Sequence, residues 1–329
     1  MGKKIVVELT NRCNLHCCHC FSGRHGGHTD LPLTVLDQLL AEAHLYGFDE
    51  LSFTGGDPTV YRYFPEALQR TAKAGYRFAL NTNGWNFAQS YPKLLPYLEQ
   101  LSIITFSLDG ATAATHDQLR GIGSFRRVMQ AMSICVVKAM PFSINMVITA
   151  HNRHEVATMS TLAARLGARG LRFGHLMPAP LTTTLKFDLS PQERDAVDGE
   201  IRVLAGGAPL PLVLAPGHKS ADLFPCAPLQ FNEININCAG EMTKCCHLSG
   251  HGAGVGQGDI VGNLAEIAFG EAYQRLCTEN EQFRRAKERH FQGPITAGDH
   301  YPCWYCSRYY QKVDWLQEKV DHPWQSLLQ

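Results

Sequence analysis

Short apolar runs alternate with amphipathic stretches along the first 180 residues of the chain. Six runs are rich in β-branched and other apolar residues, as expected of strands covered on both faces. The predicted strands are Ile5–Thr10, Leu51–Thr54, Arg77–Asn81, Ser102–Leu108, Phe142–Ile148 and Leu171–Gly174. The stretches between them have apolar residues three or four positions apart, which is typical of helices. This alternation predicts repeated β-α units around a parallel sheet, either open or curled towards a barrel.

Two predicted helix starts have polar residues that suit the first turn. Ser124 can cap a helix whose apolar stripe includes Cys135, which predicts a core position for that cysteine. Ser190 is followed by Pro191 and Glu193, the pattern of a capping box with proline in the first turn.

The character of the sequence changes after about residue 205. Glycine and proline become frequent between positions 206 and 217, and seven of the twelve cysteines follow. We therefore predict two domains, an α/β domain at 1–205 and a smaller cysteine-rich domain at 206–329.

Composition narrows the possible partners. The 30 basic and 30 acidic residues give a formal net charge of zero, which does not favour a nucleic-acid or membrane partner. No run has the roughly 20 apolar residues of a membrane span, and the N-terminus does not resemble a secretory signal. We therefore expect a cytoplasmic protein. In a reducing compartment, twelve cysteines favour metal ligation over disulfides.

Three cysteines follow the first predicted strand directly. Cys13, Cys17 and Cys20 have the spacing C-x3-C-x2-C. Three thiolates in one loop can hold three irons of a [4Fe–4S] cubane and leave the fourth iron open to another ligand. A zinc site that draws on Cys17, Cys20 and His16 or His19 is the alternative.

That spacing after the first strand resembles the radical S-adenosylmethionine (SAM) superfamily. The turns that end the next three predicted strands agree with it, and together they suggest a ligand site at one sheet edge. The resemblance implies a partial (β/α)6 barrel that binds SAM, with an arginine for its carboxylate. The implied SAM-binding residues are Gly55, Gly56, Asp57, Asn81, Asn83, Ser107, Asp109 and Arg120. Asp57 stands where the family has a glutamate, a departure that leaves the backbone contact possible.

The C-terminal cysteines resemble the Twitch half of a SPASM extension, which carries one auxiliary [4Fe–4S] cluster. The implied ligands are Cys226, Cys245, Cys303 and Cys306. Cys238 is an alternative to Cys226, and a four-thiolate zinc site is an alternative to the cluster. The expected cofactors are therefore two [4Fe–4S] clusters and SAM.

Cys246 follows a predicted cluster ligand directly. Adjacent side chains of an extended segment point to opposite faces, so Cys246 can face the barrel and donate a hydrogen atom to a substrate radical. With this cysteine pair, the chain looks most like an aminoglycoside epimerase that converts neomycin C to neomycin B. The alternatives are a dehydrogenase of an aminocyclitol or sugar alcohol, an enzyme that modifies a ribosomal peptide, and a zinc-ribbon interaction protein without enzymatic activity.

An aminoglycoside is a small polycationic molecule, so its site should contain ionised carboxylates. Glu8, Asp109 and Glu233 are the candidate carboxylates, and His247 is a further candidate for substrate contact. A reducing electron donor such as flavodoxin or ferredoxin is the expected partner.

Overall fold

The computed structural model describes residues 2–20, 28–178, 187–251, 256 and 258–328. Its strands form one ten-stranded sheet in the order β10-β9-β8-β1-β2-β3-β4-β5-β6-β7. The strands are β1 (Lys3–Thr10), β2 (Phe48–Gly55), β3 (Arg77–Thr82), β4 (Leu101–Ser107), β5 (Phe142–Ile148), β6 (Leu171–His175), β7 (Leu212–Leu214), β8 (Glu233–Ile236), β9 (Glu241–Thr243) and β10 (Ile260–Asn263).

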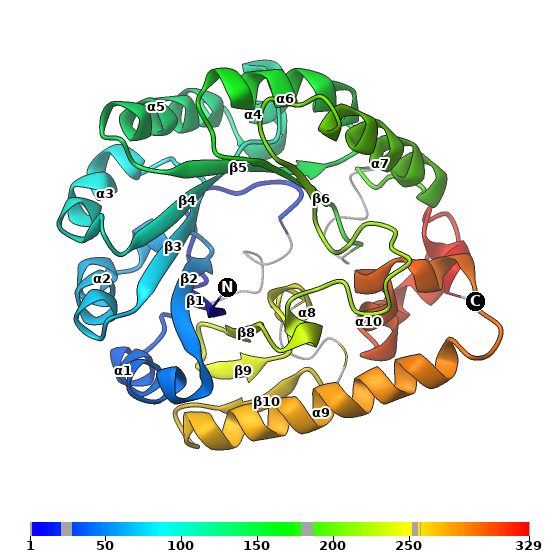
Figure 1. Cartoon of the computed structure of the whole chain (residues 1–329). Coiled ribbons are helices and arrows are strands. Elements are labelled where there is room, and N and C mark those ends of the chain that lie inside the picture. The colour runs from blue at the N-terminus through cyan, green and yellow to red at the C-terminus, as the bar shows by residue number, and fades with distance from the viewer. Residues whose placement is uncertain (1, 21–27, 179–186, 252–255, 257, 329) are drawn as a thin grey trace.

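The first six strands are parallel neighbours in chain order, as the repeated β-α pattern predicts. Their helices lie outside the curved sheet, so that the strands form most of a ring (Figure 1). The outer helices are α1 (Leu33–Glu42), α2 (Phe64–Lys73), α3 (Phe87–Leu94), α4 (Ala113–Arg120), α5 (Ser124–Val137), α6 (Val156–Arg165) and α7 (Pro191–Ala205). This confirms the predicted α/β fold with a parallel sheet, curled as a partial barrel.

Helix starts agree with the sequence in one case and differ in another. The capping box of Ser190 and Glu193 is present at the start of α7. Ser124 is the first residue of α5 rather than its cap, because Gly123 occupies the cap position with a positive φ of 84°. The Ser124 hydroxyl instead donates to Asp117 of α4, at 3.1 Å.

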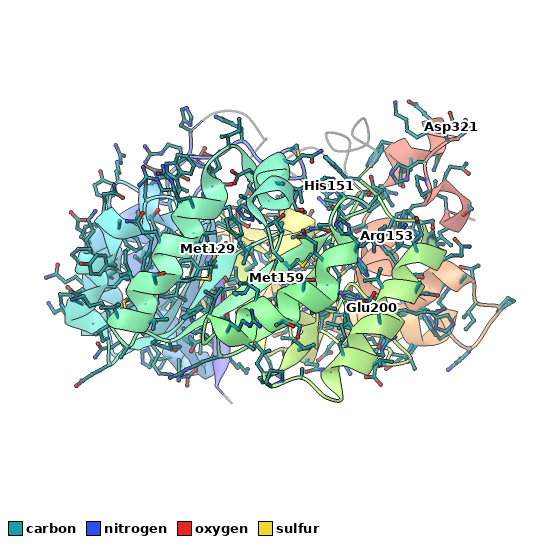
Figure 2. The ribbon with its side chains drawn as sticks, turned by 90° about the horizontal axis from the view of Figure 1, so that it is seen from above. Met129, His151, Arg153, Met159, Glu200 and Asp321 are labelled. Carbon is teal, nitrogen blue, oxygen red and sulfur yellow. The ribbon has the colours of Figure 1, made fainter. Side chains whose placement is uncertain are left out.

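A continuous core fills the space between the sheet and the outer helices. It includes Phe53, Phe78, Phe106 and Phe173, none of which is exposed, and Cys135 of α5 is buried in it as predicted. Figure 2 shows the helical layer from above, with Met129 on α5, Met159 on α6 and Glu200 on α7. No helix among the described residues is both long and apolar enough to cross a bilayer.

The segment after residue 205 continues the same sheet. β7 pairs with β6 at one end, and β8 pairs in parallel with β1 at the other. β9 and β10 then add antiparallel strands beyond β8. The long helix α9 (Phe269–His290) lies outside these strands, while α8 (Cys246–Ser249) lies inside the ring, close to α10 (Pro302–Tyr309) (Figure 1). The division at 205/206 stays a prediction, and the sheet itself crosses it.

Candidate functional site

A cavity of about 250 Å³ opens at the carboxyl ends of the parallel strands. All three N-terminal cysteines of the C-x3-C-x2-C spacing line it. Six of the eight residues predicted to bind SAM line it as well, namely Gly55, Gly56, Asn81, Asn83, Ser107 and Arg120. The two others, Asp57 and Asp109, are buried beside it. The sheet edge therefore brings together residues from five separate segments of the sequence.

The cysteine loop packs directly against the turn after β2. The Gly56 amide donates to the Thr10 carbonyl at 2.7 Å, and the Asp57 amide donates to the Arg12 carbonyl at 2.9 Å. A Cβ at Gly55 would lie 2.1 Å from the Thr10 oxygen, and one at Gly56 would lie 2.1 Å from the Arg12 oxygen. Both positions therefore require glycine.

Asp57 joins two of the cavity's turns. Its carboxylate accepts hydrogen bonds from the Thr59 amide at 2.9 Å, and from the Thr82 hydroxyl and the Asn83 amide at 2.8 Å each. Burial raises the pKa of Asp57, and these donors oppose that shift. The side chain thus holds the β2 and β3 turns together and does not line the cavity.

Asn83 and Arg120 each place a side-chain nitrogen close to a cysteine sulfur of the loop. The Asn83 side-chain amide lies 3.5 Å from Cys13 Sγ, and Arg120 Nη1 lies 3.9 Å from Cys17 Sγ. Cys18, in contrast, is directed to α4, where its sulfur lies 3.3 Å from the Leu119 carbonyl oxygen. The loop therefore separates three cavity cysteines from one that binds the protein backbone.

Asp109 positions Arg120. It accepts a hydrogen bond from Arg120 Nε at 2.5 Å and lies 3.0 Å from His19 Nε2. Its other oxygen accepts the Val147 amide at 2.8 Å. Burial opposes the ionisation of Asp109, but Arg120 and His19 outweigh burial and hold its pKa below the usual range. Asp109 is thus an ionised carboxylate that is already fully partnered, and it offers no free charge to a substrate.

The sequence did not single out several residues of the cavity wall. Asn145, His175, Leu176 and Met177 lie on β5 or at the end of β6 and line the same cavity. Their position at the ends of the fifth and sixth strands was the available signal, because ligands bind at that edge in α/β barrels.

The C-terminal cysteines meet at a second place. Cys226, Cys245 and Cys306 pack against one cluster of buried residues that includes Leu229, Leu248 and Phe283. Cys303 lies three residues before Cys306 on α10, which puts the two on the same helix face.

Electrostatic interactions also connect the four C-terminal cysteines that the sequence predicts as cluster ligands. Cys303 and Cys306 each interact with Cys226, and Cys245 interacts with both of them. Cys238 instead interacts with Glu8, Asp30 and Glu241. Of the two alternatives, the structure thus brings Cys226, and not Cys238, to this set.

The sulfur spacing of both sites suits a group larger than one metal ion. Four thiolates on one zinc lie about 3.8 Å apart, because Zn–S bonds are about 2.3 Å long. Among the described residues, no three cysteine sulfurs lie within 4.8 Å of one another. Burial raises the pKa of Cys13 to about 11 and of Cys17 to about 12, so a bound cation would have to displace the thiol protons. Three cysteines could therefore share one metal ion only if their sulfurs moved closer together.

Cys246 is the first residue of α8, the helix that lies inside the ring (Figure 1). Its side chain is exposed to solvent, with Glu233 and Glu8 among its electrostatic neighbours. Cys245 precedes it as the helix cap, and its sulfur accepts the Leu248 amide at 3.4 Å. The two neighbouring cysteines differ in exposure, although both interact electrostatically with Cys303.

The three remaining candidates for substrate contact already have partners. Glu233 forms an ion pair with Lys4 at 2.9 Å, and Glu8 lies 3.4 Å from the Asn235 side-chain amide. Burial raises the pKa of Glu8 to about 7. His247 lies 3.2 Å from the Ser307 hydroxyl on α10, and burial lowers its pKa to about 4.

Comparisons with known proteins agree with this geometry. Residues 7–163 match the model of the radical SAM superfamily, whose members use a [4Fe–4S] cluster and SAM. An AdoMet-dependent heme synthase of Methanosarcina barkeri is 30% identical over 53% of this chain and 50% of its own length. The mycofactocin maturase MftC of Mycobacterium tuberculosis is 32% identical over 57% of this chain and 48% of its own. The chain thus spans about half the length of these curated relatives.

Two solved structures share the fold at 15% identity. SuiB of Streptococcus suis bound to S-adenosylmethionine has a TM-score of 0.70 over 83% of this chain and 65% of its own. The structure of anSMEcpe with bound AdoMet and Kp18Cys peptide has a TM-score of 0.67 over 96% of this chain and 97% of its own. The similarity to anSMEcpe extends through the C-terminal segment.

Proposed function

Because the chain belongs to the radical SAM superfamily through residues 7–163, we propose that it is an enzyme that inverts a carbon centre of a peptide substrate. We assign one [4Fe–4S] cluster to Cys13, Cys17 and Cys20, and an auxiliary cluster to Cys226, Cys245, Cys303 and Cys306. When bound, the N-terminal cluster and SAM supply a carbon radical that removes a hydrogen atom from the substrate.

The observation that carries the proposal is the position of Cys246. Cys246 begins α8, the helix that lies inside the ring, and its side chain is exposed next to a predicted cluster ligand. Cys246 donates its hydrogen atom to the substrate carbon on the face opposite the one attacked, so one hydrogen leaves, another arrives, and the centre inverts. The sulfur then needs one electron and one proton to become a thiol again.

Glu8 is suited to return that proton. Its carboxylate makes hydrogen bonds with Asn235 and with Ser249, three residues after Cys246 on α8, and its pKa of about 7 lets it hold or release a proton. The electron comes from a reducing protein such as flavodoxin or ferredoxin.

Two observations favour a peptide over an aminoglycoside. SuiB and anSMEcpe, which share the fold, have both been solved with a bound peptide. A polycation would need free carboxylates, but Glu233 is paired with Lys4 and Asp109 with Arg120. Conversion of neomycin C to neomycin B thus stays a prediction without support from either observation.

The test incubates the anaerobic, reconstituted enzyme with SAM and reductant in D2O, with a synthetic peptide library in one arm and neomycin C in another. We expect one deuterium in a peptide product, because a thiol exchanges its proton with solvent. Cys246→Ala should still form 5′-deoxyadenosine and bind both clusters, but should not incorporate deuterium. Cys277→Ala, a cysteine of α9, is the matched control.

Three results would contradict the proposal in different ways. Deuterium in neomycin B alone would assign the substrate to the aminoglycosides. A product two hydrogens lighter than its substrate would make the enzyme a dehydrogenase. Normal inversion by Cys246→Ala would exclude this cysteine as the donor.

A further inference from the structure

Three buried side chains converge at the seam between the last parallel strands and α7. His175 ends β6, Asp198 lies in the middle of α7, and His218 follows β7. Asp198 Oδ1 lies 2.9 Å from His175 Nε2 and 2.5 Å from His218 Nδ1. One ligand atom from each residue lies within 4.8 Å of the others, and among the described residues this is the single such set. Asp198 and His218 have no role in the proposed function, whereas His175 also lines the cavity at the sheet edge.

The contacts of His218 determine where its proton lies. His218 Nε2 is 2.9 Å from the Phe173 carbonyl oxygen, which can only accept, so Nε2 carries a hydrogen. In a neutral ring, Nδ1 then has a lone pair that faces the Asp198 carboxylate. Two lone pairs at 2.5 Å repel each other, so either a second proton on the imidazole or a bound cation has to lie between these atoms.

The remaining atoms of the cluster lack partners. Asp198 Oδ2 and His175 Nδ1 are both buried, and neither has a hydrogen-bond partner in the described part of the chain. An unpaired carboxylate oxygen in the interior is costly, and buried polar groups normally have a partner.

Arg194, one turn earlier on α7, does not fill this gap. Its guanidinium binds the Leu176 carbonyl and lies 4.0 Å over the Trp324 ring, and it interacts electrostatically with Asp188 and, more weakly, with Asp198. Arg194 thus adds positive charge near Asp198, but it gives the buried Asp198 Oδ2 no hydrogen bond.

We propose that His175, Asp198 and His218 bind one divalent transition-metal ion of the zinc class, separate from both cysteine sites. Two imidazoles and a carboxylate are a ligand set that zinc accepts. The His218 bond to the Phe173 carbonyl is the kind of outer contact that orients a metal-binding histidine. Ligand atoms on one zinc lie about 3.3 Å apart, so the His218–Asp198 contact has to open by roughly 0.8 Å.

The position of the site indicates what the ion does. It joins the end of β6 to α7 and to the segment that leads into the C-terminal half. Beside His218, a Cβ on Gly217 would lie 3.6 Å from Cys303 Sγ, so this segment borders the C-terminal cysteines. The ion fixes the segment against the barrel.

The test measures zinc in protein that has first been reconstituted with iron and sulfide, then incubated with zinc sulfate and desalted. We expect about one zinc per chain, with a first shell of nitrogen and oxygen at about 2.0–2.1 Å and no sulfur at about 2.3 Å in X-ray absorption. His218→Gln and Asp198→Asn should weaken zinc binding by roughly tenfold or more, because even the loss of an outer contact costs about that much.

Controls separate this site from the cysteines and from misfolding. Cys17→Ala and Cys303→Ala should keep the zinc, which makes the result independent of the proposed reaction. His322→Gln removes another buried histidine, near Asp188, and should also keep it. Iron content and circular dichroism show which variants fold. The proposal would be overturned if zinc were bound by sulfur, or if both folded ligand variants kept their zinc. It would also be overturned if the wild type bound no zinc, and a proton shared between His218 and Asp198 would then hold their short contact.

Discussion

The two cysteine sites differ in how the chain builds them. Cys13, Cys17 and Cys20 come from one loop and line an open cavity. The C-terminal four come from three segments that are distant in sequence, and three of them pack against a hydrophobic cluster. Three ligands beside a cavity leave room for a small molecule on the metal, whereas four ligands in a packed setting leave none. The first site is thus suited to bind SAM and the second to transfer electrons.

The largest expected effect separates the two sites by activity. Cys17→Ala removes a ligand of the cavity site, so SAM cleavage should be abolished and iron should fall from about eight to about four per chain. The measurements are 5′-deoxyadenosine by chromatography and iron by colorimetry. SAM cleavage by the variant, or zinc in place of iron in the wild type, would contradict the assignment.

The second prediction concerns the packed site. Cys303→Ala should also lose about four irons but keep part of the SAM cleavage, because the cavity ligands are intact. Cys238→Ala is the matched control, since Cys238 interacts with Glu8, Asp30 and Glu241 and not with the other cysteines. Loss of iron from Cys238→Ala alone would show that the ligand set is wrong.

The third prediction tests how the cavity is held. Asp109→Asn leaves Arg120 buried without its counter-ion, which typically costs about 3–5 kcal/mol of stability. We expect a lower melting temperature and SAM binding weakened by about tenfold, or about 1.4 kcal/mol.

Asp117→Asn, on the same helix as Arg120, is the control. Asp117 accepts the Gly123 and Phe125 amides at 2.7 Å each, so its loss should lower the melting temperature without changing the affinity for SAM. If Asp109→Asn and Asp117→Asn bound SAM with equal affinity, Asp109 would have no role in positioning Arg120 for SAM.

The smallest expected effect is a dependence of the protein's stability on pH, caused by Glu8. Burial raises the pKa of Glu8 from 4.5 to about 7, so between these values the folded protein keeps a proton that the unfolded chain has lost. Stability contributed by this group is therefore present below pH 4.5 and is lost as the pH rises to about 7.

Glu8→Gln cannot ionise and should gain melting temperature relative to wild type as the pH rises from about 5 to about 8. Glu66→Gln, exposed on α2, should show no such trend. If the difference in melting temperature between Glu8→Gln and wild type stayed constant across this pH range, a raised pKa of Glu8 would be excluded.

The sequence by itself determined the elements and the first site. Strand Phe142–Ile148 has its predicted bounds, because a run of apolar residues sets both the type and the limits of a buried strand. Cys13, Cys17 and Cys20 could be grouped from spacing alone, because all three lie in one short loop.

Only the tertiary structure decided which distant residues meet. The choice between Cys226 and Cys238 depends on how β8 and α10 are arranged around the ring, and local sequence carries no signal for that. The same holds for Asp109, whose charge is fully used by Arg120 and His19, and for the convergence of His175, Asp198 and His218. Local patterns follow from short-range sterics and periodic burial, whereas contacts between distant segments arise only when the whole sheet closes its core.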